Sequence, residues 1–284
     1  MRKTILVRMM AAAAFVVCAT LAYTQAPNKP SKLDVVKLAD NMYAIHNDFV
    51  PGNTTALITN EGVLLVDDKF DVDGENIVAE VKKLTSQPIK FVVSTHYHGD
   101  HSGSNALMQK LGAKVVSSEA AHKRMLAAKQ PGPADVTIEQ KGHIYLGGQT
   151  VDLYYFGRAH TDGDIVAHFP AQKVLSAGDM FAYGDATPEL IDYEGGGSAK
   201  SWTTTLDGAL KLDFQRVVPG HGVVTTKAEM ANFRASTLSL QNKVHAMMVA
   251  KKSKAEIEAM LRKDFHYADL HVMFSLDGLM KEMK

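Results

Sequence analysis

Segment 94–103, STHYHGDHSG, places three histidines and one aspartate within six residues. His96 and His98 are two positions apart, so their imidazoles point to the same side in extended or turn backbone. Asp100 and His101 are adjacent, so their side chains diverge and can serve a second centre close by. The spacing therefore predicts ligands for two metal ions rather than four ligands for one ion.

Three further segments each carry a potential ligand behind a predicted strand. They are YYFGRAHTDGD with His160, KVLSAGDMF with Asp179 and RVVPGHG with His221. Asp179 alone would be more typical of a turn or a cap, and either histidine alone is ambiguous. With the first cluster they provide five imidazoles and two carboxylates. This set suits zinc, iron, nickel or manganese, and zinc is the default choice where no sulfur is present.

The elements that must position these residues alternate between strands and helices. Apolar residues at helical spacing predict helices at 74–84, 102–112, 119–129, 198–212 and 226–252, with another helix behind Ser253. Alternating or continuous apolar runs predict strands within 35–47, on both sides of the turn at 60–62, at 89–94, at 113–118, in several segments from 136 to 181, and at 216–219.

The chain has no linker rich in Pro and Gly, so residues 27–284 are predicted to form a single α/β domain. Two sheets packed face to face, with helices outside, accommodate the order of the elements. The order alone is equally compatible with one sheet.

The first 26 residues are predicted to be a signal peptide. Arg2, Lys3 and Arg8 accompany an apolar run that is followed by a polar segment. The run is short for a bilayer span of about 20 residues. We therefore expect a periplasmic or secreted protein without a membrane span after cleavage. The cleavage point and lipidation of Cys18 stay open, although Val17 is bulky for a lipoprotein signal.

The composition limits the class of partner. The 284 residues are 46% hydrophobic and 22% charged, with a formal net charge of zero, which is ordinary for a globular protein and gives no basic footprint for nucleic acid. Cys18 is the single cysteine and lies in the signal, so thiolate nucleophiles, disulfides and cysteine ligands are excluded from the mature chain. A small-molecule substrate is expected, and the oligomeric state stays open.

The segments THYHGDH, GRAHTDGD, SAGDMF and PGHG, in this order, resemble the metallo-β-lactamase fold superfamily of hydrolases over residues 35–221. The resemblance implies an αββα sandwich of two mixed β-sheets flanked by helices, with the metal site at one edge. It also implies the ligands of each metal: His96, His98 and His160 for the first, Asp100, His101 and His221 for the second, and Asp179 as the bridge.

The chemistry implied by this resemblance is that of a binuclear zinc metallohydrolase. A metal-bridging hydroxide would cleave an ester, thioester, lactone or amide bond. Asp100 would act catalytically, orienting the hydroxide and passing a proton to the leaving group. Two zinc ions per chain are expected, with iron or manganese as alternatives.

Two other activities remain open within the same fold. The β-lactamases with a cysteine ligand are excluded, whereas the all-histidine β-lactamases share the Asp-His pair and the distal histidine. They typically lack the bridging aspartate that Asp179 supplies. A mononuclear iron dioxygenase is the second alternative, and the complete ligand set and His98 disfavour it.

Two segments are candidates for substrate contacts. In NDFVPGNTT, Phe49 and Asn53 are expected to face the metals, and Tyr183 and Tyr193 follow Asp179 in a segment rich in turn residues. Both segments are also typical of ordinary surface loops. Asp67, at the end of GVLLV, is expected to hydrogen-bond a ligand histidine, or else to be a solvated turn residue.

Overall fold

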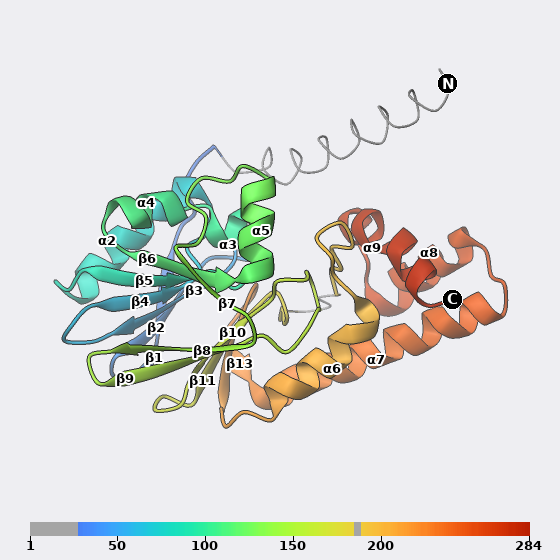
Figure 1. The fold of residues 1–284 in the computed structure, drawn as a ribbon. Coiled ribbons are helices and arrows are strands. Elements are labelled where there is room, and N and C mark those ends of the chain that lie inside the picture. The colour runs from blue at the N-terminus through green and yellow to red at the C-terminus, as the bar shows by residue number, and fades with distance from the viewer. Residues whose placement is uncertain (1–27, 185–188) are drawn as a thin grey trace, which may run out of the picture.

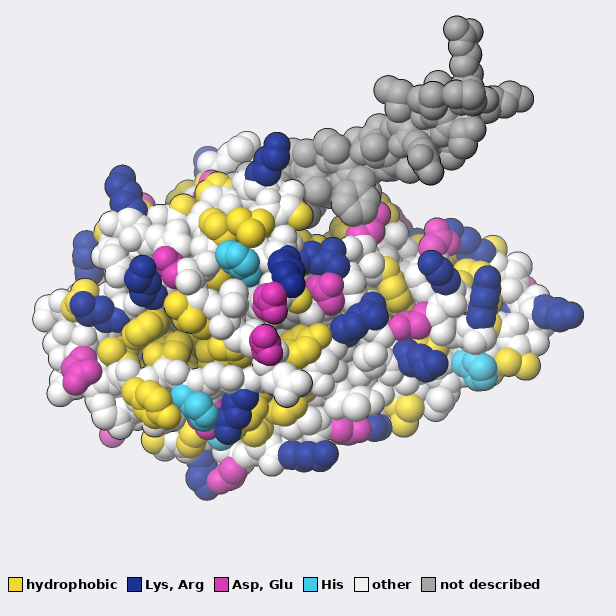
Figure 2. Space-filling view, viewed as in Figure 1, with side chains coloured by type: hydrophobic (Ala, Val, Ile, Leu, Met, Phe, Trp, Pro, Cys, Tyr) yellow, Lys and Arg dark blue, Asp and Glu magenta, His cyan; other side chains and the backbone are white. Residues whose placement is uncertain are grey.

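The computed structural model of the protein describes residues 28–184 and 189–284, and the predicted signal peptide at 1–26 lies outside this part. Two mixed β-sheets lie face to face, and helices cover their outer faces (Figure 1). This arrangement confirms the predicted αββα sandwich and rules out the single-sheet alternative. On the face shown in Figure 2, basic and acidic side chains are interspersed.

The first sheet contains seven strands in sequential order. They are β1 (Asp34–Ala39), β2 (Met42–His46), β3 (Thr54–Ile58), β4 (Val63–Val66), β5 (Ile89–Val93), β6 (Lys114–Ser118) and β7 (Val136–Ile138). β1 to β4 pair antiparallel, and β4 to β7 pair parallel. Parallel neighbours need crossover connections. These contain α2 (Gly74–Leu84), α3 (Gly99–Ser102), α4 (Asn105–Lys110) and α5 (Glu119–Ala127), with a short 3-10 turn, η1 (Asp71–Asp73), ahead of α2.

The second sheet contains six strands in the order β13-β12-β11-β10-β9-β8. Their bounds are β8 (Lys141–Leu146), β9 (Gln149–Tyr154), β10 (Val166–Phe169), β11 (Val174–Gly178), β12 (Arg216–Pro219) and β13 (Thr225–Thr226). Pairing is antiparallel except between β11 and β12, which run parallel and are joined by a crossover connection that contains α6 (Ala199–Leu210).

The main core lies between the two sheets. Leu57 and Leu64 of the first sheet and Leu153 and Phe169 of the second belong to one fully buried apolar cluster. Burying such surface is the dominant favourable contribution to folding, at about 25 cal/mol per Å². A second cluster lies under α2, and a third joins the second sheet to the C-terminal helices. The cluster between the sheets therefore holds the two sheets against each other.

Residues 227–284 add three helices beside the sandwich: α7 (Lys227–Val249), α8 (Lys254–Phe265) and α9 (Asp269–Glu282) (Figure 1). The sequence predicted a helix behind Ser253 but not its division into α8 and α9. His266, with φ of 56°, ends α8 in the left-handed region, which is unusual for a residue other than Gly or Asn. Across 28–184 and 189–284, the structure has no helix with the length and apolarity that a membrane span requires.

Candidate metal centre

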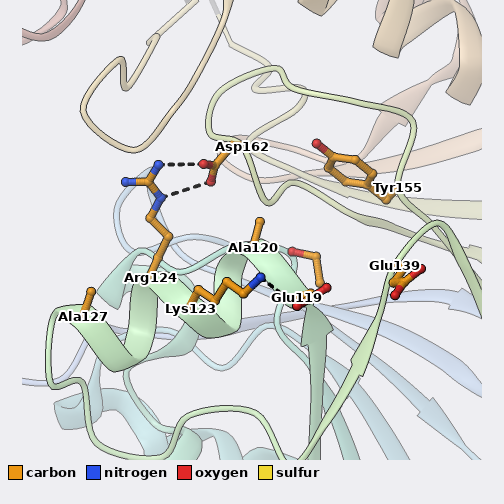
Figure 3. A pocket seen from close by; sticks show the side chains of 9 residues that line it. Glu119, Ala120, Lys123, Arg124, Ala127, Glu139, Tyr155 and Asp162 are labelled. Carbon is orange, nitrogen blue, oxygen red and sulfur yellow. Dashed lines mark hydrogen bonds and ion pairs between the residues drawn. The ribbon is translucent and has the colours of Figure 1, made fainter.

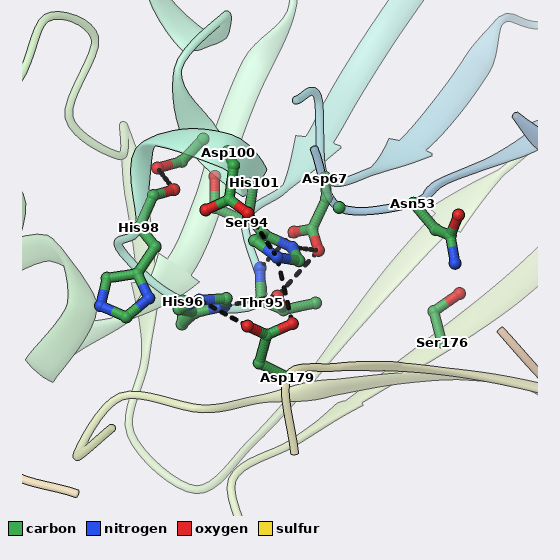
Figure 4. A network of polar contacts seen from close by, with 12 residues as sticks. Asn53, Asp67, Ser94, Thr95, His96, His98, Asp100, His101, Ser176 and Asp179 are labelled. Carbon is green, nitrogen blue, oxygen red and sulfur yellow. Dashed lines mark hydrogen bonds and ion pairs between the residues drawn. The ribbon is translucent and has the colours of Figure 1, made fainter. Parts of the chain in front are cut away.

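The seven candidate ligands converge on one edge of the sandwich. His96, His98, Asp100 and His101 follow β5 and enter α3, while His160 lies between β9 and β10. Asp179 directly follows β11, and His221 follows β12. Figure 4 shows His96 and His101 from the first sheet facing Asp179 from the second. Each sheet thus supplies part of a common site.

The ligand atoms form two groups, each with its atoms within 4.8 Å of one another. The first contains His96, His98, His160 and Asp179, and the second contains Asp100, His101 and His221. His98 Nδ1 lies 2.9 Å from His160 Nε2, and His101 Nε2 lies 3.3 Å from His221 Nε2. Nitrogens that share a tetrahedral zinc ion at about 2.05 Å are about 3.3 Å apart, so the spacing is close to that of a ligand set.

Asp179 faces both groups, one oxygen to each. Its Oδ2 lies 3.5 Å from His160 Nε2 and 3.8 Å from His96 Nε2. Its Oδ1 lies 3.1 Å from His101 Nε2 and 3.3 Å from His221 Nε2. Asp100 Oδ2 lies 3.4 Å from His221 Nε2, on the second side. The carboxylate of Asp179 is therefore placed between the two groups.

The buried nitrogen of His96 indicates that the site fits a cation. The ring is fully buried, and its Nε2 has no hydrogen-bond partner among the described residues. A buried polar atom left without a partner costs about 1–3 kcal/mol. Burial also lowers the pKa of His96 well below its usual value, so the ring is neutral and offers a lone pair. Imidazoles and carboxylates without thiolate suit zinc, iron or manganese.

Charge around the second group favours a cation as well. Burial alone would lower the pKa of His101, but Asp179, Asp100 and Asp67 outweigh it and raise that pKa well above its usual value. For Asp179 the effect of burial is overcome by His221 and His101, which lower the pKa of its carboxyl well below the usual value. Divalent ions can replace the protons that these imidazoles would otherwise hold, which makes metal binding depend on pH.

Hydrogen bonds behind the imidazoles fix which nitrogen faces the site. Asp67 accepts from His101 Nδ1 at 2.8 Å and from the amide and hydroxyl of Thr95 at 2.7 and 2.8 Å. The carbonyl of Phe49 accepts from His221 Nδ1 at 2.8 Å, and that of Leu190 accepts from His160 Nδ1. In each of these histidines Nε2 is left free to face the cluster. Asp67 thus lies where the sequence placed it, in contact with a candidate ligand.

Asp192 contacts the candidate ligand His98, and the sequence did not indicate this contact. Its Oδ2 accepts from His98 Nε2 at 2.9 Å and from the Tyr97 hydroxyl at 2.5 Å. His98 therefore presents Nδ1, rather than Nε2, to the cluster. Asp192 is 94 residues from His98, in an irregular segment, and no local pattern relates the two. Sequence reasoning singled out the neighbouring Tyr193 instead.

Phe49 is the predicted substrate contact that borders the site. Its side chain is 42% exposed, and its ring stacks on His221 with 5.2 Å between centroids. Asn53 is buried, and its Nδ2 donates to the carbonyls of Pro219 and Gly222 at 2.9 and 2.8 Å. Asn53 therefore holds the backbone on both sides of His221.

The two predicted tyrosines make contacts with the His221 backbone and with helix α9. Tyr183 donates its amide to the His221 carbonyl at 3.0 Å, and its ring packs against the core beneath the C-terminal helices. The hydroxyl of Tyr193 donates to Glu282 of α9 at 2.8 Å. Both residues support the site from outside it.

A cavity of about 500 Å³ opens beside α5 (Figure 3). Four of its charged side chains form ion pairs: Arg124 with Asp162 at 2.6 Å, and Lys123 with Glu119 at 2.7 Å. Among the described residues, its lining contains none of the seven candidate ligands. We therefore locate the chemistry at the sandwich edge and not in this cavity.

Comparison with known proteins agrees with the fold and the motifs. A family model described as the metallo-beta-lactamase superfamily matches residues 47–221. The metallo-beta-lactamase type 2 of Elizabethkingia meningoseptica is 27% identical over 199 residues, which cover 67% of this chain and 79% of the relative. The metallo-beta-lactamase IND-1 of Chryseobacterium indologenes is 26% identical over 175 residues, covering 60% and 71%.

Solved structures share the architecture. The metallo-beta-lactamase from Pontibacter korlensis has a TM-score of 0.65 at 24% identity, covering 73% of this chain and 99% of its own. The metallo-beta-lactamase from Hirschia baltica has a TM-score of 0.64 at 22% identity, covering 74% and 98%. At these identities the likeness concerns the fold alone.

The fold and the site define a metal-dependent hydrolase of the αββα type. The matched range covers more than half of the chain and contains all seven candidate ligands. The chain therefore belongs to the metallo-beta-lactamase superfamily.

Proposed function

We propose that this chain is an exported binuclear zinc hydrolase that cleaves an ester, thioester, lactone or amide bond. The observation that carries the proposal is the position of Asp179, with Oδ2 towards His96 and His160 and Oδ1 towards His101 and His221. A site for one ion would not require a carboxylate that is shared between two groups of imidazoles. The mononuclear dioxygenase is therefore the weaker alternative.

The proposed roles follow from the geometry. The first ion would be held by His96, His98 and His160, the second by Asp100, His101 and His221, and both by Asp179. Such a pair, when bound, acts as a Lewis acid towards a carbonyl oxygen and lowers the pKa of water. The carboxylate of Asp100 is 19% exposed, more than the other carboxylate of the site, so it can exchange a proton with a leaving group.

Metal content and turnover test the proposal together. Protein purified without chelator or affinity metal should contain about two zinc ions per chain, and it should hydrolyse at least one member of a panel of esters, thioesters, lactones and β-lactams. Asp100→Asn should lower kcat by about 10²-fold or more while the first centre keeps its ion. One iron per chain, with oxygen consumption in place of hydrolysis, would contradict the hydrolase.

A β-lactam is the second candidate substrate, because both relatives described above are metallo-beta-lactamases. Asp179 argues against it, since the all-histidine β-lactamases typically lack that bridge. The ratio of kcat/KM for a chromogenic cephalosporin to that for an aryl thioester or lactone distinguishes the two. If kcat/KM for the cephalosporin is higher by an order of magnitude, β-lactams are the preferred class of substrate.

Export is part of the same proposal and rests on the sequence of residues 1–26. Fractionation of the producing cells, followed by mass measurement of the N-terminus, tests it. A chain that retains residues 1–26 in the cytosol would contradict export without affecting the proposed chemistry.

A further inference from the structure

Segment 189–198 supports two imidazoles of the first group from behind. Its Leu190 carbonyl accepts from His160 Nδ1, and its Asp192 carboxylate accepts from His98 Nε2 at 2.9 Å. The Tyr97 hydroxyl donates to the same Asp192 oxygen at 2.5 Å. The orientation of both rings therefore depends on where this segment lies.

Asp192 is fixed within the segment by backbone hydrogen bonds. The Gly195 amide donates to Asp192 Oδ1 at 2.7 Å, and the Gly197 amide donates to the Asp192 carbonyl at 2.7 Å. The Asp192 amide in turn donates to the His160 carbonyl at 2.9 Å. A Cβ on Gly195 would overlap the Asp192 carboxylate, so the backbone must approach the carboxylate closely here.

Helix α9 holds the segment on both sides of Asp192. The Ile191 amide donates to Ser275 Oγ at 3.0 Å, and the Tyr193 hydroxyl donates to Glu282 Oε2 at 2.8 Å. The Tyr193 ring occupies the space that a side chain on Gly278 would fill. Three positions of one helix therefore contact the two residues that flank Asp192.

The second group is supported by other parts of the chain. His101 rests on Asp67, which follows β4, and His221 rests on the carbonyl of Phe49. Both supports come from the N-terminal half of the chain. His96 of the first group shares the Asp67 support, because the Thr95 hydroxyl lies 3.1 Å from His96 Nδ1 and donates to Asp67. The supports of His98 and His160 are separate from those of the second group, and α9 contacts the segment that provides them.

We propose that Asp192 is a positioning residue that makes His98 ligate through Nδ1, and that α9 keeps Asp192 in place, so that the C-terminal helix sets the metal affinity of the first centre. A ring N–H held by a carboxylate fixes the tautomer and orientation of a ligating histidine. The inference rests on the proposed function, because it requires a metal ion in the first group. Helix α9 lies outside the range 47–221 that the superfamily model matches.

The test is a titration of the metal-free, full-length protein with Zn²⁺ and Co²⁺ in competition with a chelator. The variants are Asp192→Asn, which keeps the volume and loses the charge, and Glu282→Gln, which touches no candidate ligand. Asp264→Asn is the matched control, because it breaks a 2.8 Å ion pair with Lys243 elsewhere in the C-terminal helices. Thermal unfolding of each metal-free variant checks that it is folded.

We expect Asp192→Asn to weaken the first centre by about 10–100-fold. Glu282→Gln should act in the same direction by a smaller factor, while the second centre and the Asp264→Asn control keep wild-type affinity. In the Co²⁺ protein, the exchangeable ring N–H signal of His98 should shift or disappear in Asp192→Asn. The corresponding signal of His101 should stay, which a general loss of structure would not produce.

Three results would overturn the inference. Wild-type protein that binds no pair of ions would remove the proposed function and the inference with it. Wild-type protein that binds two ions, with Asp192→Asn and Glu282→Gln unchanged in affinity and in the His98 signal, would remove the inference alone. Equal weakening of both centres in either variant would show that α9 supports the fold as a whole and not the first centre.

Discussion

Asp179 connects the two groups of imidazoles through a single side chain. Its oxygens lie between 3.1 and 3.8 Å from four different imidazole nitrogens. A carboxylate in this position neutralises part of the charge of any ion on either side, so both ions depend on it. The two centres are therefore expected to be coupled through one residue.

Asp179→Asn should weaken the binding of both ions, whereas His221→Ala should weaken the second ion alone. The reason is that Asn keeps an oxygen for one side but loses the charge that both sides share. Stoichiometry by mass spectrometry after dialysis against graded chelator measures the effect. Retention of two ions by Asp179→Asn would contradict the bridging role.

Lys69 is a fully buried amine next to the site. Its Nζ donates to Asn47 Oδ1 at 2.7 Å and to the Gly52 carbonyl at 2.6 Å. Burial lowers the pKa of Lys69 to about 7, although Asp73, Asp67 and Asp100 oppose the shift. Between this value and 10.5 the unfolded chain holds more protons than the folded one, so the contribution of Lys69 to stability rises with pH.

The stabilisation from Lys69 is expected to increase with pH in the metal-free protein. From pH 7 to 9 the free energy of unfolding of the wild type should rise relative to that of Lys69→Met, by up to about 1.4 kcal/mol per pH unit. Denaturant titrations of both proteins at several pH values give the difference in the free energy of unfolding. The contributions of all groups other than Lys69 cancel in this difference. Parallel curves would mean that Lys69 is not the titrating group.

Local patterns could reveal the ligands and the support from Asp67, but not the support from Asp192. The four ligands of 94–103 lie within six residues, and the other three follow apolar strands, so each has a local signal. Asp192 has none, because its partner His98 is 94 positions away and the segment between them folds back. The neighbouring Tyr193 has a local signal, since it follows Asp179 in a segment rich in turn residues, and the structure shows its hydroxyl donating to Glu282.

At the scale of elements, segment 47–53 packs tightly over the second group. The Gly52 amide donates to the Asp100 carbonyl at 3.1 Å, and a Cβ on Gly52 would overlap the His101 ring. The carbonyl of Phe49 in the same segment holds His221. The segment thus fixes three candidate ligands of the second centre by backbone contacts, for which a glycine is required at position 52.

Gly52→Ala should therefore displace the His101 ring and weaken the second centre, while the first centre is kept. Gly99→Ala is the matched control, because it lies between His98 and Asp100, yet a Cβ there meets nothing within 4 Å in the described part of the chain. Chelator competition on both variants measures the affinities. If Gly99→Ala were the more damaging change, the packing argument would be wrong.

Elements with a regular apolar period were predictable. Helix α2 begins and ends where the spacing of Ile77, Val78 and Val81 predicted, since these side chains are buried under the sheet. The break between α8 and α9 was not predictable, because His266 adopts the left-handed conformation without the usual glycine signal. The choice between one sheet and two also needs contacts between distant strands, which no local pattern supplies.

At the scale of the whole molecule, the site joins the two sheets. His96, His98, Asp100 and His101 come from the first sheet, and His160, Asp179 and His221 come from the second. Ions bound between them would add to the apolar core and to the buried hydrogen bond between Thr55 and Ser176, 2.6 Å long. Binding to the folded state alone stabilises it in proportion to the occupancy of each site.

Removal of the ions with a chelator should lower the Tm by about 5–10 °C for each ion removed. An ion present at about 100 times its Kd contributes about 2.7 kcal/mol, and a domain of this size loses about 2–4 °C per kcal/mol. Calorimetry before and after dialysis, with zinc added back as a control, measures the shift. An unchanged Tm would mean that the sheets need no ions to hold them together.

The contact between α9 and segment 189–198 can form only after the last part of the chain has been synthesised. Tyr193 and Glu282 are 89 residues apart, so at a synthesis rate of about 5–20 residues per second Glu282 is added roughly 4–18 s after Tyr193. Both sheets are complete in the nascent chain before that moment. An unfinished chain therefore presents His98 and His160 while the segment behind them still lacks its anchor, and the first cluster gains its final support only when α9 is synthesised.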